Sequence, residues 1–406
     1  MDFRFTPEQE AFRQEFIAWL DGYLEKAGDT SRFRATDTGE AWGQAHKSFQ
    51  KALFDAGYAG LQYPEVYGGK GKSLAEEIVV QQTVAEQCME LRIPGVITFG
   101  MAAPTILLCG TEAQKQTYLP RIMDGTHIWC QGFSEPNAGS DVVNVATSAV
   151  KDNGHYVVNG QKVWTSFAHM ADYCILLVRT DPDGKKHKGL SYLLMDMKLP
   201  GIEVRPITQI TGHPEFNEVF MEDVRVPVDM RVGEEGDGWR IAITTLMFER
   251  TVGDATMAAA FMGNLKAMID MAKQTKRSGR PVIEDPVFRQ QLARAYIDIM
   301  VLKYHGYRNL SQLFAGGIPG AEGSIGKLLW SEPNQRITED ALSMQGPLGQ
   351  ILGGSPWAIQ EGIWQFGFLR SKGNTIEAGT SEIQRNIIGE RVLGLPKDTS
   401  RMARQQ

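Results

Sequence analysis

The feature that most constrains this sequence is a double change in hydrophobic spacing along its 406 residues. In the first third, apolar residues recur every three or four positions, as between Phe12 and Leu20, which is the spacing of amphipathic helices. From about Trp129 the pattern becomes short alternating or β-branched runs, which are typical of strands. After Gly238 the helical spacing returns and persists to about Leu393. The sequence therefore predicts helical, β and helical regions, in that order.

These changes indicate an α+β multidomain fold. We expect an N-terminal helical domain over residues 1–126, a middle β domain over 127–235 and a C-terminal helical domain over 236–395. The polar residues 396–406 form a tail that we expect to be mobile. With 42% hydrophobic side chains, a chain of this length can build a substantial core in each domain.

Two short signals make this expectation specific. Thr6 suits the N-cap of a first helix, with Pro7 at its first position and Gln9 placed to complete a capping box. Asn159-Gly160 lies between two β-type runs and is the strongest short-range signal for a tight hairpin. We therefore expect a helix from residue 7 and a hairpin turn at residues 159–160.

The composition excludes several kinds of partner and site. A net charge of −6 offers no basic field for nucleic acid or an anionic membrane. Four dispersed cysteines lack the spacing of a zinc site or a disulfide framework, and the seven histidines form no metal-binding pattern. The N-terminus lacks the character of a signal peptide, and no apolar run reaches the ~18 residues of a spanning helix. We expect a cytoplasmic protein without a metal site.

Fingerprints of other enzyme classes do not occur in the sequence. There is no GxGxxG after a strand and no GxxxxGK[ST] loop, so Rossmann-type and P-loop nucleotide binding lack support. The HExxH and GxSxG motifs are missing as well.

The most informative segments are Trp129–Asp141 and Val163–Ser166. In the first, a strand-like run ends in Ser, Pro, Asn and Gly, which commonly form turns. On the structural interpretation, the segment is only a strand that ends in a polar turn. On the functional interpretation, the same turn offers N–H groups and hydroxyls to the carbonyl edge of a flat heterocycle. The second segment adds an aromatic face at Trp164, which alone is more typical of strand packing. Together the two segments favour a site for a planar ligand.

In these and other segments the sequence resembles the acyl-CoA dehydrogenase family, including bacterial enzymes of the FadE type, from the first helix to about Pro396. The shared segments are weak singly and specific as an ordered set: Pro64–Gly69, Ser134–Asp141, Asn159–Trp164, Glu218–Phe220 followed by Val226–Pro227, Gly236–Trp239, and Gly379–Arg385. The resemblance implies a β-barrel-like middle domain and a C-terminal four-helix bundle. It also implies FAD-dependent dehydrogenation of an acyl-CoA thioester to the trans-2-enoyl-CoA, with electrons passing to an electron-transferring flavoprotein.

The resemblance assigns roles to individual positions. Phe133 and Ser134 match contacts to the pyrimidine edge of FAD, and Ser140 matches a contact on the coenzyme A side. Trp164 matches the residue packed beside the isoalloxazine ring, and Ser166 the hydroxyl near flavin N5. At the adenosine end of FAD, the matching positions are Thr380 and Glu382.

The catalytic base is where this sequence departs from the most familiar members of the family. Those enzymes carry glutamate immediately before the Gly379 motif, where this chain has Ala378, whose N–H is expected to bind the thioester carbonyl. Isovaleryl-CoA and long-chain acyl-CoA dehydrogenases instead place the glutamate on a helix before an arginine, a pattern that Glu249 and Arg250 fit. Glu249 is the expected base, Arg250 is expected to lie at the substrate, and Glu377 is the rival base.

A second departure concerns the FAD contacts that the family takes from a neighbouring subunit. Two stretches of this chain correspond to those contacts, one near Arg277 and one near Gln345 and Gly346. At the aligned places, however, the family's residues are replaced by others. Either these nearby residues take over in a homodimer or homotetramer, or a homologous second subunit supplies the contacts in an α2β2 assembly, as in some bacterial relatives with steroid-type substrates. The homo-oligomer is the expectation, because most soluble oligomers consist of identical chains.

The sequence leaves the acyl group open, with only small residues such as Gly95 and Gly100 as a hint of room for a bulky one. Two other functions stay as alternatives. One is a flavin-dependent monooxygenase of the same fold, which needs no α-proton base, and the other is a non-catalytic subunit, which would bind no flavin.

Overall fold

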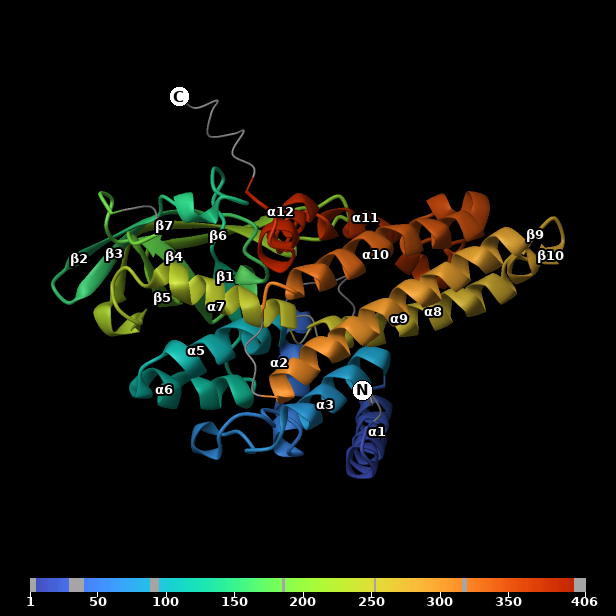
Figure 1. Cartoon of the computed structure of the whole chain (residues 1–406), viewed down its shortest axis with the longest axis horizontal. Coiled ribbons are helices and arrows are strands. Elements are labelled where there is room, and N and C mark those ends of the chain that lie inside the picture. The colour runs from blue at the N-terminus through green and yellow to red at the C-terminus, as the bar shows by residue number, and fades with distance from the viewer. Residues whose placement is uncertain are drawn as a thin grey trace. The chain divides into compact units, whose positions relative to one another are not determined.

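The structure, a computed structural model, describes residues 5–28, 40–87, 95–184, 187–251, 253–315 and 320–397, without the side chains of residue 40 and residues 249–251. The chain divides into two compact units, Met1–Glu249 and Arg250–Gln406, which are treated separately below (Figure 1). The predicted order of helical, β and helical regions is confirmed. Most of the expected tail lies outside the described residues.

The first unit begins with helices: α1 (Pro7–Ala27), α2 (Glu40–Asp55), α3 (Leu74–Gln87), the short α4 (Gly95–Ile97) with a π-helical turn over Thr98–Ala102, α5 (Ala103–Cys109) and α6 (Glu112–Met123). The predicted capping box is confirmed, because the N–H of Gln9 donates to Thr6 Oγ1 and the N–H of Thr6 donates to Gln9 Oε1. Aromatic side chains hold α1 in place, with the ring of Phe16 edge-on to Tyr58 at 4.8 Å between centroids.

The middle of the chain forms one sheet whose eight described strands are β1 (Trp129–Gly132), β2 (Ser148–Asp152), β3 (His155–Lys162), β4 (Tyr173–Arg179), β5 (Leu190–Asp196), β6 (Ile202–Ile207), β7 (Phe216–Pro227) and β8 (Arg231–Val232). Their order is β6-β7-β3-β2-β4-β5-β8, with β1 added in parallel beside β4. The sheet therefore brings the ends of β1 and β3, which carry the predicted site segments, into one layer.

The predicted hairpin position is wrong. The turn joins β2 to β3 and contains Asn153 and Gly154, whereas Asn159-Gly160 lies within β3. At residues 159–160 the pairing with β7 shifts register, which marks a bulge. A Cβ on Gly160 would lie 2.6 Å from Thr147 Oγ1, so this glycine is explained by close packing and not by a turn.

Two cores cover the two faces of this sheet. On one face, residues of α5, α6, β1 and β5 pack with Ile241 and Ala242 of α7 (Gly238–Thr251). The other core contains Cys130, Tyr156, Leu193 and Val226 among its members. Because α7 packs on the sheet, the sheet fixes the direction of the helix that bears Glu249.

The second unit is helical apart from a small hairpin. Its elements are α8 (Gly253–Gln274), β9 (Lys276–Arg277), β10 (Arg280–Pro281), α9 (Pro286–Phe314), α10 (Gly323–Gln345), α11 (Ile363–Asn374) and α12 (Ser381–Ile387). The long helices α8, α9 and α10 run side by side (Figure 1) and enclose a core that includes Phe261, Leu302 and Met344. No helix in the described ranges is long and apolar enough to cross a membrane.

Candidate functional site

The two polar segments that the sequence singles out lie next to each other where β1 and β3 end. The N–H of Val163 donates to the carbonyl oxygen of Ser134 over 2.9 Å. The ammonium group of Lys162 donates to the carbonyl oxygen of Phe133 over 3.1 Å. Regular pairing stops at this point of the sheet, so both segments are free to present polar groups.

Trp164 presents its indole ring to solvent from a strained backbone. Its φ is 59°, in the left-handed region, and the residue is 57% exposed. The flanking backbone is fixed, because Thr165 and Asn217 exchange two N–H to carbonyl bonds of 3.0 and 3.1 Å. A non-glycine residue in this conformation costs roughly 1–3 kcal/mol and persists where the surroundings enforce it, often at binding sites. An exposed aromatic face held in this way is a suitable wall for a planar ligand.

Several hydrogen-bonding groups in the two segments have no partner within the described part of the chain. They include the N–H and hydroxyl of Ser134 and the hydroxyl of Ser166. Two more are buried, Nε2 of Gln131 and Oγ1 of Thr165. An unpartnered buried polar group costs about 1–3 kcal/mol, so such groups are normally met by ordered water or by a ligand, and the two segments offer them to either.

Gln131 is a candidate site residue that the sequence analysis did not name. It is an amide in a four-residue strand whose other members are Trp, Cys and Gly, and this break in an apolar run was the available signal. Ser140, which was predicted, is exposed beyond a tight turn in which Glu135 and Ala138 exchange two backbone bonds of 3.0 Å.

A buried chain of hydroxyl groups fixes α7. Thr245 Oγ1 lies 2.9 Å from Thr105 Oγ1 of α5 and 3.1 Å from the hydroxyl of Tyr192 of β5. The ring of Tyr192 in turn meets Phe133 edge-on, with centroids 5.8 Å apart. Thr245 precedes Glu249 by one helical turn, so these contacts position the helix that carries the predicted base. The side chains of Glu249 and Arg250 lie outside the described residues, and their roles stay predictions.

In the second unit, the rival base Glu377 is held by its neighbours. Its carboxylate accepts two bonds from the guanidinium of Arg370, at 2.9 and 3.2 Å, and one of 2.7 Å from Nδ2 of Asn374. The next residue, Ala378, has a φ of 53°. Its N–H donates no hydrogen bond to any described residue, so this strained turn has a donor available for an external carbonyl.

The two residues predicted for the adenosine end of FAD stand at the start of α12. Thr380 is the N-cap, and its hydroxyl oxygen accepts from the N–H of Ile383 over 3.2 Å. Glu382 is exposed in the first turn, where a backbone N–H and the hydroxyl of Thr380 lower the pKa of its carboxyl group. Both side chains are therefore held near the surface of this unit.

The predicted partner-side residues differ in their surroundings. Gln345 ends α10 and is buried, with its Oε1 accepting from Nε2 of Gln365 over 2.9 Å. Gly346 follows with a φ of 60°. Arg277 lies in the exposed β9–β10 hairpin, 5.3 Å from the ring centroid of Phe288.

Comparison of the chain with known proteins identifies related sequences over almost its whole length. Sequence models of the acyl-CoA dehydrogenase N-terminal, middle and C-terminal domains match residues 6–126, 130–224 and 236–393. The acyl-CoA dehydrogenase IpdE1 of Mycobacterium tuberculosis is 37% identical over 397 residues, covering 96% of this chain and 98% of that protein.

The chain belongs to the acyl-CoA dehydrogenase family.

Solved structures agree with this assignment. A structure described as the Tcur3481–Tcur3483 steroid ACAD matches with a TM-score of 0.86 at 29% identity, covering 98% of this chain and all of that one. The ChsE4–ChsE5 complex from Mycobacterium tuberculosis matches with a TM-score of 0.84 at 32% identity, again over 98% of this chain and all of the other. The chain is thus an enzyme of the oxidoreductase class that acts on CH–CH donors.

Acyl-CoA dehydrogenases use FAD, and the residues described above fit its isoalloxazine ring. The pyrimidine edge of that ring carries carbonyl oxygens and an N–H, and the unpartnered groups of Gln131 and Ser134 are complementary to it. Trp164 supplies an exposed aromatic ring in the adjacent segment, which the Val163–Ser134 hydrogen bond joins to the first. Within the described residues, no group of three or more His, Cys, Asp or Glu side chains is arranged to hold a metal ion.

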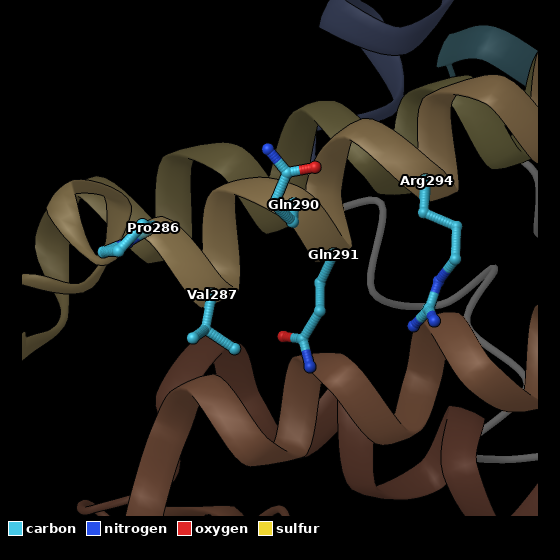
Figure 2. Close-up of a pocket in the computed structure, with 5 residues that line it drawn as sticks. All are labelled: Pro286, Val287, Gln290, Gln291 and Arg294. Carbon is cyan, nitrogen blue, oxygen red and sulfur yellow. The ribbon is translucent and has the colours of Figure 1, made fainter.

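A pocket on the surface of α9 is separate from these residues. Figure 2 shows the side chains that line it: Pro286, Val287, Gln290, Gln291 and Arg294. Its volume is about 690 Å³, and Arg294 is paired with Asp340 at 3.0 Å. None of the predicted site residues belongs to it, so it plays no part in the chemistry proposed below.

Proposed function

We propose that this chain binds FAD and dehydrogenates an acyl-CoA thioester between its α and β carbons. The observation that carries the proposal is the hydrogen bond between Val163 and Ser134, which joins the segment with the unpartnered donors of Gln131 and Ser134 to the segment with the exposed ring of Trp164. Bound FAD would supply one function, acceptance of a hydride from the β carbon. Ser166 would lie near N5, and the Phe133–Ser134 peptide would face the pyrimidine edge through the N–H of Ser134.

The proposed base is Glu249, which would take the α-proton on its carboxylate as the C=C bond forms. The pairing of Glu377 with Arg370 and Asn374 supports this choice, because three hydrogen bonds already hold its carboxylate inside its own unit. The N–H of Ala378 would donate to the thioester oxygen, where negative charge develops in the transition state. Thr380 and Glu382 would hold the adenosine end of FAD.

For the substrate, we propose a coenzyme A thioester with a polycyclic, steroid-type acyl group. The description of a similar structure as a steroid ACAD supports this class over short linear chains. Ser140, exposed beyond its turn, would contact the coenzyme A part, and Arg250 would contact the substrate beside the base.

For the assembly, we propose an oligomer, with α2β2 pairing to a homologous subunit favoured over a homodimer or homotetramer. Two observations support this choice. Gln345 is engaged inside its own helical bundle, and one similar structure is a complex of two different chains. The proposed electron acceptor is an electron-transferring flavoprotein. The free thiols of Cys109, Cys130 and Cys174 support the cytoplasm as the compartment.

The test is a visible spectrum of the purified protein, recorded without oxygen before and after acyl-CoA esters are added. We expect a flavin spectrum that bleaches with a steroid-type thioester more readily than with a linear one of similar carbon number. A protein that binds no FAD, alone or coexpressed with a homologous chain, would contradict the proposal and favour a non-catalytic subunit. Flavin well below one per protomer for the chain alone, restored by the second chain, would identify the α2β2 form.

A further inference from the structure

A buried ion pair lies directly behind the peptide groups that face the proposed flavin. Lys162, at the end of β3, has no solvent exposure, and its ammonium group lies 2.8 Å from Oε1 of Glu135. The same ammonium donates to the carbonyl oxygen of Phe133 over 3.1 Å. A lysine is almost never fully buried unless it is paired, and Lys162 meets this condition through Glu135. Burying a charged pair is still costly, so its role at this place requires an explanation.

The carboxylate of Glu135 is fully bound, which fixes the pair in position. Besides Lys162, it accepts from the N–H of Ala146 at 2.6 Å, the N–H of Thr147 at 2.9 Å and the hydroxyl of Thr147 at 2.6 Å. The pair therefore ties the end of β1 to the start of β2 and to the end of β3. Burial acts to raise the pKa of Glu135, but Lys162 and these donors outweigh it and hold that pKa below its usual value.

The ammonium group acts on one particular peptide unit. The carbonyl of Phe133 and the N–H of Ser134 belong to the same planar trans peptide and point in opposite directions. Because Lys162 holds the carbonyl, the N–H must point away from the buried pair, and it has no partner within the described part of the chain. A positive charge at the carbonyl oxygen also polarises the peptide, which strengthens the N–H as a donor.

We propose that Lys162 is a positioning residue for the flavin, whose buried charge orients and polarises the Phe133–Ser134 peptide so that its N–H stabilises the reduced cofactor. This inference rests on the proposed FAD site. Reduction adds electron density to the pyrimidine edge of a flavin. A strengthened donor there therefore binds the reduced form more tightly than the oxidised form and raises the midpoint potential.

The test compares the midpoint potential of bound FAD in the wild-type protein, Lys162→Met and Lys162→Gln. The first variant keeps the length of the side chain without its charge, and the second keeps a donor for Glu135. We expect the affinity for reduced relative to oxidised FAD to fall about tenfold in both variants, which for a two-electron couple lowers the potential by about 30 mV.

A matched control separates this effect from loss of stability. Val226 is fully buried in the same sheet and pairs with Tyr156, six residues before Lys162 on β3 and about 20 Å away along the strand. Val226→Ala should lower the melting temperature and leave the potential unchanged. If the Lys162 variants melt lower with an unchanged potential, or fail to fold, Lys162 is only a structural anchor and the inference is overturned. A wild-type protein that takes up no FAD would instead refute the proposed function itself.

Discussion

At the scale of single residues, Trp164 carries a backbone strain that an FAD site would explain. Because glycine adopts a φ of 59° freely, Trp164→Gly should leave the melting temperature of the FAD-free protein unchanged or slightly higher, through relief of about 1 kcal/mol. The same change removes the aromatic wall and should weaken FAD binding at least tenfold, as measured by flavin fluorescence. A less stable FAD-free protein with unchanged FAD affinity would show that the indole serves packing alone.

The choice of base makes a prediction that separates two glutamates. Glu249→Gln should keep the flavin spectrum but slow its reduction by substrate on the order of 10²–10⁴-fold, which is the usual contribution of a general base. Glu377→Gln weakens a pair with Arg370 and should change that rate far less. Stopped-flow reduction measured for both variants decides between them, and the reverse ranking would make Glu377 the base.

The buried lysine gives the flavin site a predicted dependence on pH. Burial lowers the pKa of Lys162 to about 8, although Glu135 and the thiol of Cys174 oppose the shift. The ammonium is therefore present below pH 8 and is lost as the pH rises through that value. The preference for reduced over oxidised FAD should fall across this interval in the wild-type protein, beyond the slope of the flavin itself. The measurement is the midpoint potential of bound FAD from pH 6 to 9.5. The extra fall near pH 8 should be missing in Lys162→Met, and an equal fall in the wild-type protein and in this variant would exclude Lys162 as its origin.

At the scale of elements, local signals predict where helices and strands occur better than how strands pair. The capping box at Thr6 needs only residues three apart, and it was predicted correctly. The hairpin was placed at Asn159-Gly160, but the chain also contains Asn153-Gly154, and the pairing with β7 decides which of the two turns. Sheet pairing is a long-range property, so the local signal alone could not select the correct pair.

The same limit applies to the site. The two ring-side segments were identified from residue types, because turns of Ser, Pro, Asn and Gly differ visibly from the strands around them. Gln131 and the burial of Lys162 were not predicted, because each depends on which way a strand residue faces and on what a distant strand places there.

One element-level prediction concerns the hydroxyl chain that holds α7. Thr245→Val keeps the side-chain shape but removes the bonds to Thr105 and Tyr192, which should cost roughly 1–3 kcal/mol in the free energy of unfolding. It should also slow flavin reduction, because α7 carries the proposed base. Thr244→Val is the matched control, since that hydroxyl bonds within the helix to the carbonyl of Arg240. Equal effects of the two substitutions in denaturant unfolding and in reduction rate would remove Thr245 from this role.

At the scale of the whole molecule, membership of the family determines the fold. The partner subunit and the acyl group of the substrate depend on residues particular to this chain. The second unit contains Ala378 and the start of α12, and the first unit contains the ring-side segments. The proposed α2β2 assembly agrees with the burial of Gln345 inside its own unit, where it pairs with Gln365.

The central claim is removal of two hydrogens from the α and β carbons of a coenzyme A thioester, and the mass of the product tests it most directly. The protein is incubated with a steroid-type acyl-CoA and an artificial electron acceptor, and the thioester is then analysed by mass spectrometry. The account predicts a product lighter than the substrate by two hydrogen atoms, with the new double bond next to the carbonyl. A product heavier by one oxygen atom, or a recovered substrate of unchanged mass from a flavin-loaded protein, would contradict it.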